Sequence, residues 1–130
     1  MTINEYLEDG ILSLTVSPVV DRFQIITRRE TDTDGYLRIR AILLDKGLLE
    51  ISIYGQFIVD AVHLIDYRFH WQDKDGKLKI RWDNARHHQE LKTFPDHVHT
   101  GEGGYEGVKE SASVNLSEVL RTLEEGIPEG

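Results

Sequence analysis

The chain has 130 residues, no cysteine and a formal net charge of -8 at pH 7. This length favours a single domain, and the absence of cysteine excludes disulfides and thiolate metal sites. There is neither an apolar run of about 18 residues nor a basic N-terminal leader, so we expect a cytoplasmic protein with no membrane span.

The acidic charge is concentrated toward the two ends of the chain. Residues 1–35 carry three basic and seven acidic side chains, and residues 100–130 carry two basic and seven acidic ones. Residues 36–99 carry ten basic and nine acidic side chains and hold all six histidines. The middle segment therefore becomes positive when its histidines take up protons, which histidine does near neutral pH.

An N-terminal helix is predicted within residues 1–18. Thr2 and Glu5 have the spacing of a capping box, in which each side chain binds the backbone N–H of the other residue. Apolar residues then recur at helical spacing as far as Ser17-Pro18, where the proline ends the helix.

A sheet is predicted over residues 19–83, because the apolar residues there alternate with a period of two. The predicted strands are residues 20–31, 36–45, 48–57, 61–72 and 77–82, joined mostly by turns that contain glycine. Residues 84–108 are predicted to be a histidine-rich loop, and residues 113–126 a C-terminal helix with a second capping box at Asn115 and Glu118. The expected fold is one α+β domain over residues 1–130, with a five-stranded, mainly antiparallel meander and both helices on one face.

Alternation also places a basic and aromatic set of side chains on the face opposite the core, provided that the strands pair in sequence order. A solvated sheet face is normally polar, and cross-strand charge pairs stabilise it by about 0.2–1 kcal/mol each. Arginine and tyrosine, however, are also the residue types that bind phosphate and stack on bases. We call this set the polar face: Tyr36, Arg38, Arg40, Glu50, Ser52, Tyr54, Asp66, Arg68, His70, Lys77, Lys79 and Arg81.

The stretch WDNARHHQELKTFPDHVH, residues 82–99, holds four of the six histidines and allows three interpretations. It fits a metal site, because His97 and His99 lie on one side of an extended chain and Asp83, Asp96 or His88 adds a ligand. No ligand spacing of a known zinc motif is present, however. It also fits an acid–base loop, or an ordinary turn after a strand in which the side chain of Asp83 or Asn84 binds its own backbone.

Cleavage of RNA without a metal needs a base for the 2′-hydroxyl, an acid for the leaving oxygen and a cation for the phosphate. Histidine suits the two proton transfers, each of which contributes about 10²–10⁴-fold in rate, and arginine suits the phosphate. The hypothesis uses no metal or other cofactor. It assigns catalysis to His70, His88, Glu50 and Tyr54, and substrate binding to Arg38, Arg40, Arg68, Arg81, His87, His97 and His99.

The stretch YRFHWQDKDGKLKIRWDNARHH, followed by LKTFPDHVH, resembles the signature of the TumE family of prokaryotic toxin–antitoxin proteins. The chain departs from the family pattern at Asp96, where the usual ending has a histidine. The resemblance implies a type II toxin with ribonuclease-like activity on cellular RNA, neutralised by an antitoxin that carries a helix-turn-helix DNA-binding domain. Family-matching positions expected to be structural are Trp71, Trp82, Asp83, Asn84 and Pro95.

Two other classes of function stay open. A non-catalytic interaction or regulatory protein would use the acidic ends to dock a basic partner or to form a homodimer. A histidine–carboxylate metalloenzyme would instead use the histidine-rich loop, with an ion held by imidazole and carboxylate groups.

Overall fold

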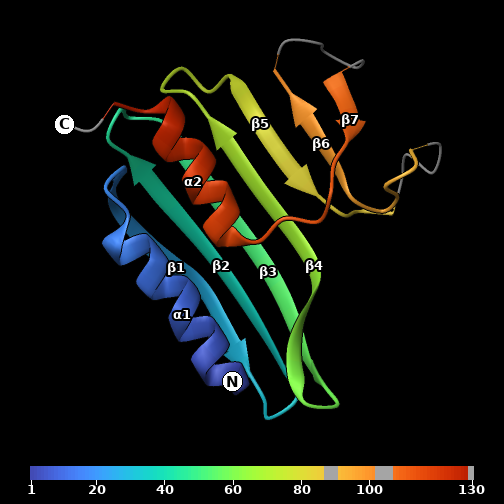
Figure 1. Cartoon of the computed structure of the whole chain (residues 1–130). Coiled ribbons are helices and arrows are strands. Elements are labelled where there is room, and N and C mark those ends of the chain that lie inside the picture. The colour runs from blue at the N-terminus through green and yellow to red at the C-terminus, as the bar shows by residue number, and fades with distance from the viewer. Residues whose placement is uncertain (87–90, 102–106, 129–130) are drawn as a thin grey trace.

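The computed structural model describes residues 1–86, 91–101 and 107–128, and these form a seven-stranded antiparallel sheet with two helices (Figure 1). Each strand pairs with the next one along the chain, so the strand order is the sequence order. The elements are α1 Ile3–Val16, β1 Val20–Glu30, β2 Asp34–Leu43, β3 Leu48–Ile58, β4 Ala61–Gln72, β5 Leu78–Asp83, β6 His97–Thr100, β7 Val108–Glu110 and α2 Leu116–Gly126.

The prediction of five strands was wrong, because one short strand lies within the segment predicted to be a loop and another begins at the last residue of that segment. They are β6, with the sequence HVHT, and β7, with the sequence VKE. Neither is long enough to show an alternating pattern. β6 forms by pairing with β5, and β7 by pairing with β6. A strand that depends on its neighbours in this way has a weak signal of its own.

Both helices begin at the capping boxes predicted from the sequence. At α1 the Thr2 hydroxyl accepts the Glu5 N–H at 3.1 Å, and the Glu5 carboxylate accepts the Thr2 N–H at 3.1 Å. At α2 the Asn115 side chain accepts the Glu118 N–H at 3.0 Å, and the Glu118 carboxylate accepts the Asn115 N–H at 3.2 Å. These bonds satisfy backbone donors that the first turn of a helix leaves open.

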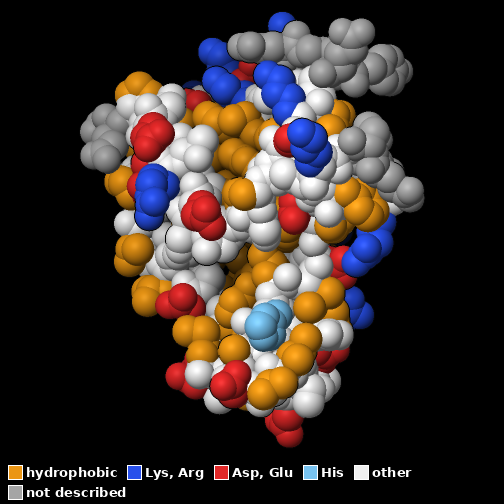
Figure 2. All heavy atoms as spheres, turned by 45° about the vertical axis from the view of Figure 1, so that its right-hand side comes forward, with side chains coloured by type: hydrophobic (Ala, Val, Ile, Leu, Met, Phe, Trp, Pro, Cys, Tyr) orange, Lys and Arg blue, Asp and Glu red, His pale blue; other side chains and the backbone are white. Residues whose placement is uncertain are grey.

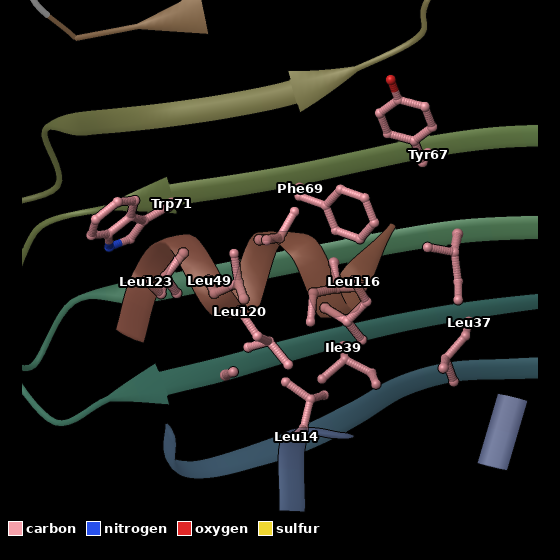
Figure 3. Close-up of a cluster of buried hydrophobic side chains, with 14 of the residues drawn as sticks. Leu14, Leu37, Ile39, Leu49, Tyr67, Phe69, Trp71, Leu116, Leu120 and Leu123 are labelled. Atoms are coloured by element: carbon pink, nitrogen blue, oxygen red, sulfur yellow. The ribbon is translucent and has the colours of Figure 1, made fainter. Parts of the chain in front are cut away.

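The two helices lie on the same face of the sheet, with α1 beside β1 and α2 across the middle strands (Figure 1). Figure 3 shows Leu116, Leu120 and Leu123 of α2 in one cluster with Phe69 and Trp71 of β4. Phe69 and Leu123 are both 0% exposed, so the predicted apolar face is the core. Neither helix combines the length and hydrophobicity that crossing a membrane requires, in the part of the chain that the structure describes.

Gly35 in β2 is needed because α1 passes close to it. A Cβ at this position would lie 2.8 Å from Ile3 Cγ2 and 3.1 Å from Leu7 Cδ1, both in buried side chains.

We expect Gly35→Ala to lower the free energy of unfolding by about 1–3 kcal/mol, measured by urea denaturation. Gly10→Ala within α1 is the control. A Cβ there meets its nearest atom at 3.9 Å, so the substitution should stabilise the helix by about 1 kcal/mol. Equal stability of the two variants would contradict this account.

Candidate functional site

Pairing in sequence order brings most of the predicted polar face together on the side of the sheet away from the helices. Directly opposite residues form rows that cross the strands and continue into β6. One row is Arg40, Glu50, His70, Arg81 and His99; a second is Arg38, Ser52, Arg68, Asp83 and His97; a third is Tyr36, Tyr54 and Asp66.

The two lysines of the predicted set lie apart from these rows. Lys77 precedes β5, and its N–H donates to the Asp73 carboxylate at 3.0 Å within a turn. The Lys79 ammonium lies 5.1 Å from the ring centroid of Trp71, a residue of the core face. The β4–β5 register shifts between Trp71 and Gln72, which interrupts strict alternation at this end of the pair. The ammonium group of Lys79 therefore lies beside a ring of the core face rather than among these rows.

Two adjoining hollows lie on the polar face and share Tyr36, Ser52 and Arg68 in their walls. The larger, of about 590 Å³, extends over β5 and the residues that follow it; the smaller, of about 240 Å³, lies over β2, β3 and β4. The larger hollow is also lined by Tyr54, Asp66, Tyr67, Arg81, Asp83, Asn84 and Ala85. The smaller one is also lined by Arg38, Glu50, Ile51 and His70.

His70 has one ring nitrogen in a hydrogen bond and the other buried without a partner among the described residues. Its Nε2 lies 3.0 Å from the Gln72 side-chain oxygen, which can only accept, so the hydrogen-bond pattern assigns the ring hydrogen to Nε2. In the neutral ring Nδ1 then carries a lone pair. This atom is buried and has no hydrogen-bond partner among the described residues. Its chemistry is that of a proton acceptor.

Three arginines of β2 and β4 on the same face as His70 differ in their ion pairing. Arg40 forms an ion pair with Glu50, with a guanidinium nitrogen 3.0 Å from the carboxylate, and it lines neither hollow. Within the described part of the chain, Arg38 and Arg68 form no ion pair, and both line the smaller hollow. Arg40 is thus placed to hold Glu50, whereas Arg38 and Arg68 have guanidinium groups without an acidic partner among the described residues.

Tyr54 already donates its hydroxyl hydrogen within the protein. The donor lies 2.8 Å from the Asp34 carboxylate, and the Gln56 amide donates to the Tyr54 oxygen at 3.1 Å. Hydrogen bonds from Thr31 and then Tyr54 hold the pKa of Asp34 below its usual value. Tyr54 therefore offers the larger hollow an anchored aromatic ring rather than a free proton donor.

Asp83 ends β5 as a buried carboxylate with several partners. Oδ1 lies 2.8 Å from His97 Nε2 and accepts the Ala85 N–H at 3.1 Å. Oδ2 lies 3.4 Å from both His99 Nε2 and Arg81 Nε. His97 is 1% exposed, so this histidine, expected to bind substrate, is buried against Asp83.

Asn84 and Asp96 support the structure around this carboxylate. Asn84 Oδ1 accepts the Tyr67 N–H at 2.9 Å and its Nδ2 donates to the Ile65 carbonyl at 2.8 Å, which continues the pairing with β4 after β5 ends. The Tyr67 hydroxyl donates to Asp96 at 2.7 Å, and burial, followed by this contact, raises the pKa of Tyr67 well above its usual value. No pattern in the sequence indicates the contact between Tyr67 and Asp96.

The remaining expected site residues fall into two groups, and three residues without an expected role also line the hollows. Trp71 and Trp82 lie on the core face, and the carbonyl of Pro95 accepts from His97 Nδ1 at 2.9 Å. His87 and His88 lie outside the described residues. Tyr36, Ser52 and Asp66 line the hollows although the sequence hypothesis gave them no role. Their alternation placed them on this face, and only the pairing showed that they adjoin its arginines.

The model of one protein family, described as Toxin TumE, matches residues 7–127. The matched span includes every described strand, α2 and most of α1. No curated protein and no solved structure matches the chain.

Proposed function

The chain belongs to the TumE toxin family, and from this premise we propose that it is the toxin of a type II toxin–antitoxin pair that cleaves cellular RNA. Family membership indicates the toxin role and an antitoxin partner. The cleavage chemistry, and an antitoxin with a helix-turn-helix domain, are the further parts of the proposal.

One observation carries the nuclease proposal. The smaller hollow brings His70 and Glu50 together with Arg38 and Arg68, so an imidazole, a carboxylate and two guanidinium groups line one surface depression. Cleavage of RNA through its own 2′-hydroxyl requires proton transfer and stabilisation of a phosphate that gains negative charge. These side chains provide both, and guanidinium groups match phosphate oxygens in geometry.

The proposed reaction begins with the 2′-hydroxyl giving its proton to Nδ1 of His70, a buried atom that a rotation of the side chain must first expose. The 2′-oxygen attacks the neighbouring phosphorus while Arg38 and Arg68 bind its oxygens, and the bond to the 5′-oxygen breaks. A second histidine returns a proton to that leaving oxygen, and His88 is the candidate for this step. Arg40 forms an ion pair with Glu50, and this carboxylate lies directly opposite His70, beside the imidazolium that forms in this step.

The larger hollow would accept the neighbouring nucleotides. Tyr36 and Tyr54 line it with aromatic rings, and stacking of a base on such a ring contributes about 1–3 kcal/mol. Tyr54 is held by Asp34, and the Tyr36 hydroxyl accepts from Ser52 at 3.2 Å. Proton transfer and phosphate binding both come from side chains in this scheme, so the chemical step is proposed to need no metal at the scissile phosphate.

Induction of the full chain without an antitoxin tests the proposal. We expect growth arrest with fragmented cellular RNA.

Arg68→Gln should slow RNA cleavage by about 10²-fold, because one donor to the developing charge is lost. Arg22→Gln, at an ion-paired arginine whose side chain is 74% exposed on β1, is the matched control and should cleave like the parent. Growth arrest with intact RNA would reject the nuclease while leaving the toxin role.

A non-catalytic regulatory or interaction protein is the second candidate function. It is favoured by exposed apolar side chains on α1 and on the edge strand β1, where Val16 is 69% and Ile26 is 42% exposed. A partner, or a second copy in a homodimer, would cover such residues. Absence of both arrest and RNA cleavage, with tight binding of the antitoxin, would support this candidate.

A further inference from the structure

Three side chains that ligate metals converge at the end of β5. One ligand atom from each of Asp83, His97 and His99 can be chosen so that all three lie within 4.8 Å of one another. His97 and His99 alternate along β6, so both rings project from the polar face, and β5–β6 pairing places them beside Asp83. Ligands about 2.0–2.2 Å from a tetrahedral zinc ion lie about 3.4 Å apart, so modest rearrangement of the side chains would close this spacing.

The hydrogen bonding of His97 favours a cation at this point. Its Nδ1 lies 2.9 Å from the Pro95 carbonyl, which can only accept, so Nδ1 carries a hydrogen. In the neutral ring Nε2 then carries a lone pair, and this atom lies 2.8 Å from the Asp83 carboxylate. Two electron-rich atoms at that distance require a proton or a metal ion between them. Histidines that bind metals typically donate their second N–H to a backbone carbonyl or a carboxylate.

From this geometry we propose that Asp83, His97 and His99 form a binding site for one divalent transition-metal ion, with zinc as the best match. Imidazole and carboxylate are established zinc ligands, and two histidines with one carboxylate leave a further position for water or another ligand. Strand pairing places the Asp83 carboxylate beside the two histidines. The Asp96 carboxylate instead accepts a hydrogen bond from Tyr67, so Asp83 is the proposed ligand.

The surroundings define what the ion would do and limit its affinity. Arg81 Nε lies 3.4 Å from Asp83 Oδ2, and this positive charge opposes a bound cation. Asp83 and Arg81 also line the larger hollow, so the ion would add positive charge at one end of that hollow. It would also join β5 to β6 through side chains, beyond their backbone pairing.

Zinc titration of the purified full chain tests the site directly. The chain is treated with a chelator, dialysed and titrated with zinc chloride in a calorimeter, with thermal melting recorded alongside. We expect one ion per chain and a higher melting temperature with zinc. His99→Ala should weaken binding at least tenfold and remove the thermal shift. It is the preferred variant because the His99 side chain is the most exposed of the three, at 13%.

Two variants at other histidines serve as controls. His63→Ala removes an exposed histidine of β4, and His87→Ala His88→Ala removes the adjacent pair; both should bind zinc like the parent. His97→Gln removes the second imidazole ligand, and circular dichroism compares the fold of this variant with that of the parent. The proposal is overturned if the parent takes up no stoichiometric zinc, if His99→Ala binds as tightly as the parent, or if the His87 and His88 variant alone loses the ion. No RNA is present, so each outcome is independent of the proposed nuclease.

Discussion

Replacement of His70 by glutamine is expected to lower the rate of RNA cleavage by about 10²–10⁴-fold, the usual contribution of a positioned acid or base. Glutamine retains a side-chain amide that can donate to Gln72, but it has no group that accepts a proton near neutral pH. The measurement is single-turnover cleavage of a labelled RNA by the purified chain, with Arg38 and Arg68 intact to bind phosphate.

His63→Gln is the matched control for this experiment, since it removes an exposed histidine from the same strand outside both hollows. The control should retain the parent rate. Equal melting temperatures of the two variants would show that the loss is chemical rather than structural. A His70→Gln protein that cleaves RNA at the parent rate would remove His70 from the mechanism.

Replacement of Asp83 by alanine is expected to lower the free energy of unfolding by about 3–5 kcal/mol, because it leaves buried polar partners without their carboxylate. Asp83 is 5% exposed and lies within 3.4 Å of Arg81, His97 and His99. The Ala85 N–H loses its acceptor as well. The measurement is urea denaturation at pH 7 with chelator present, so that metal binding does not contribute.

Asp66→Ala is the control for Asp83. Asp66 is an exposed carboxylate of the same face, and its removal should change stability by no more than about 0.5 kcal/mol. If the two variants are equally stable, the contacts of Asp83 contribute nothing beyond those of a surface charge. A large loss at Asp83 alone would identify the β5–β6 contact as part of the stable core of the fold.

The long strands and both helix starts could be predicted because their signals are local. Alternation from Leu37 to Leu43 and from Leu49 to Ile53 separates buried from polar positions, and the capping boxes at Thr2 and Asn115 need only residues within one helical turn. β6 and β7 could not be predicted in this way. Four and three residues show no period, and their place in the sheet depends on pairing with other strands.

The candidate site also combines features that local sequence patterns predict with features that depend on strand pairing. Alternation alone places Arg38, Glu50, Arg68 and His70 on one face, and the observed strand order makes them neighbours. The contact of His97 with Asp83 depends on the register between β5 and a strand that was not predicted. Sequence reasoning therefore found the ligand types of the cluster without finding which carboxylate they meet.

The order of the strands also bears on how the chain is made. Each strand pairs with the one synthesised just before it, so the sheet can grow in step with translation, and such local pairing avoids the cost of closing long loops. The apolar face of the sheet, by contrast, is fully covered only late in synthesis. α2, which covers Leu49 and Phe69, is the last described element (Figure 3). Figure 2 shows hydrophobic side chains still visible between charged groups on the finished surface. A chain that ends before residue 116 would thus hold α1 and all seven described strands but leave exposed the part of the core that α2 covers, and such a species is prone to aggregation and to capture by chaperones.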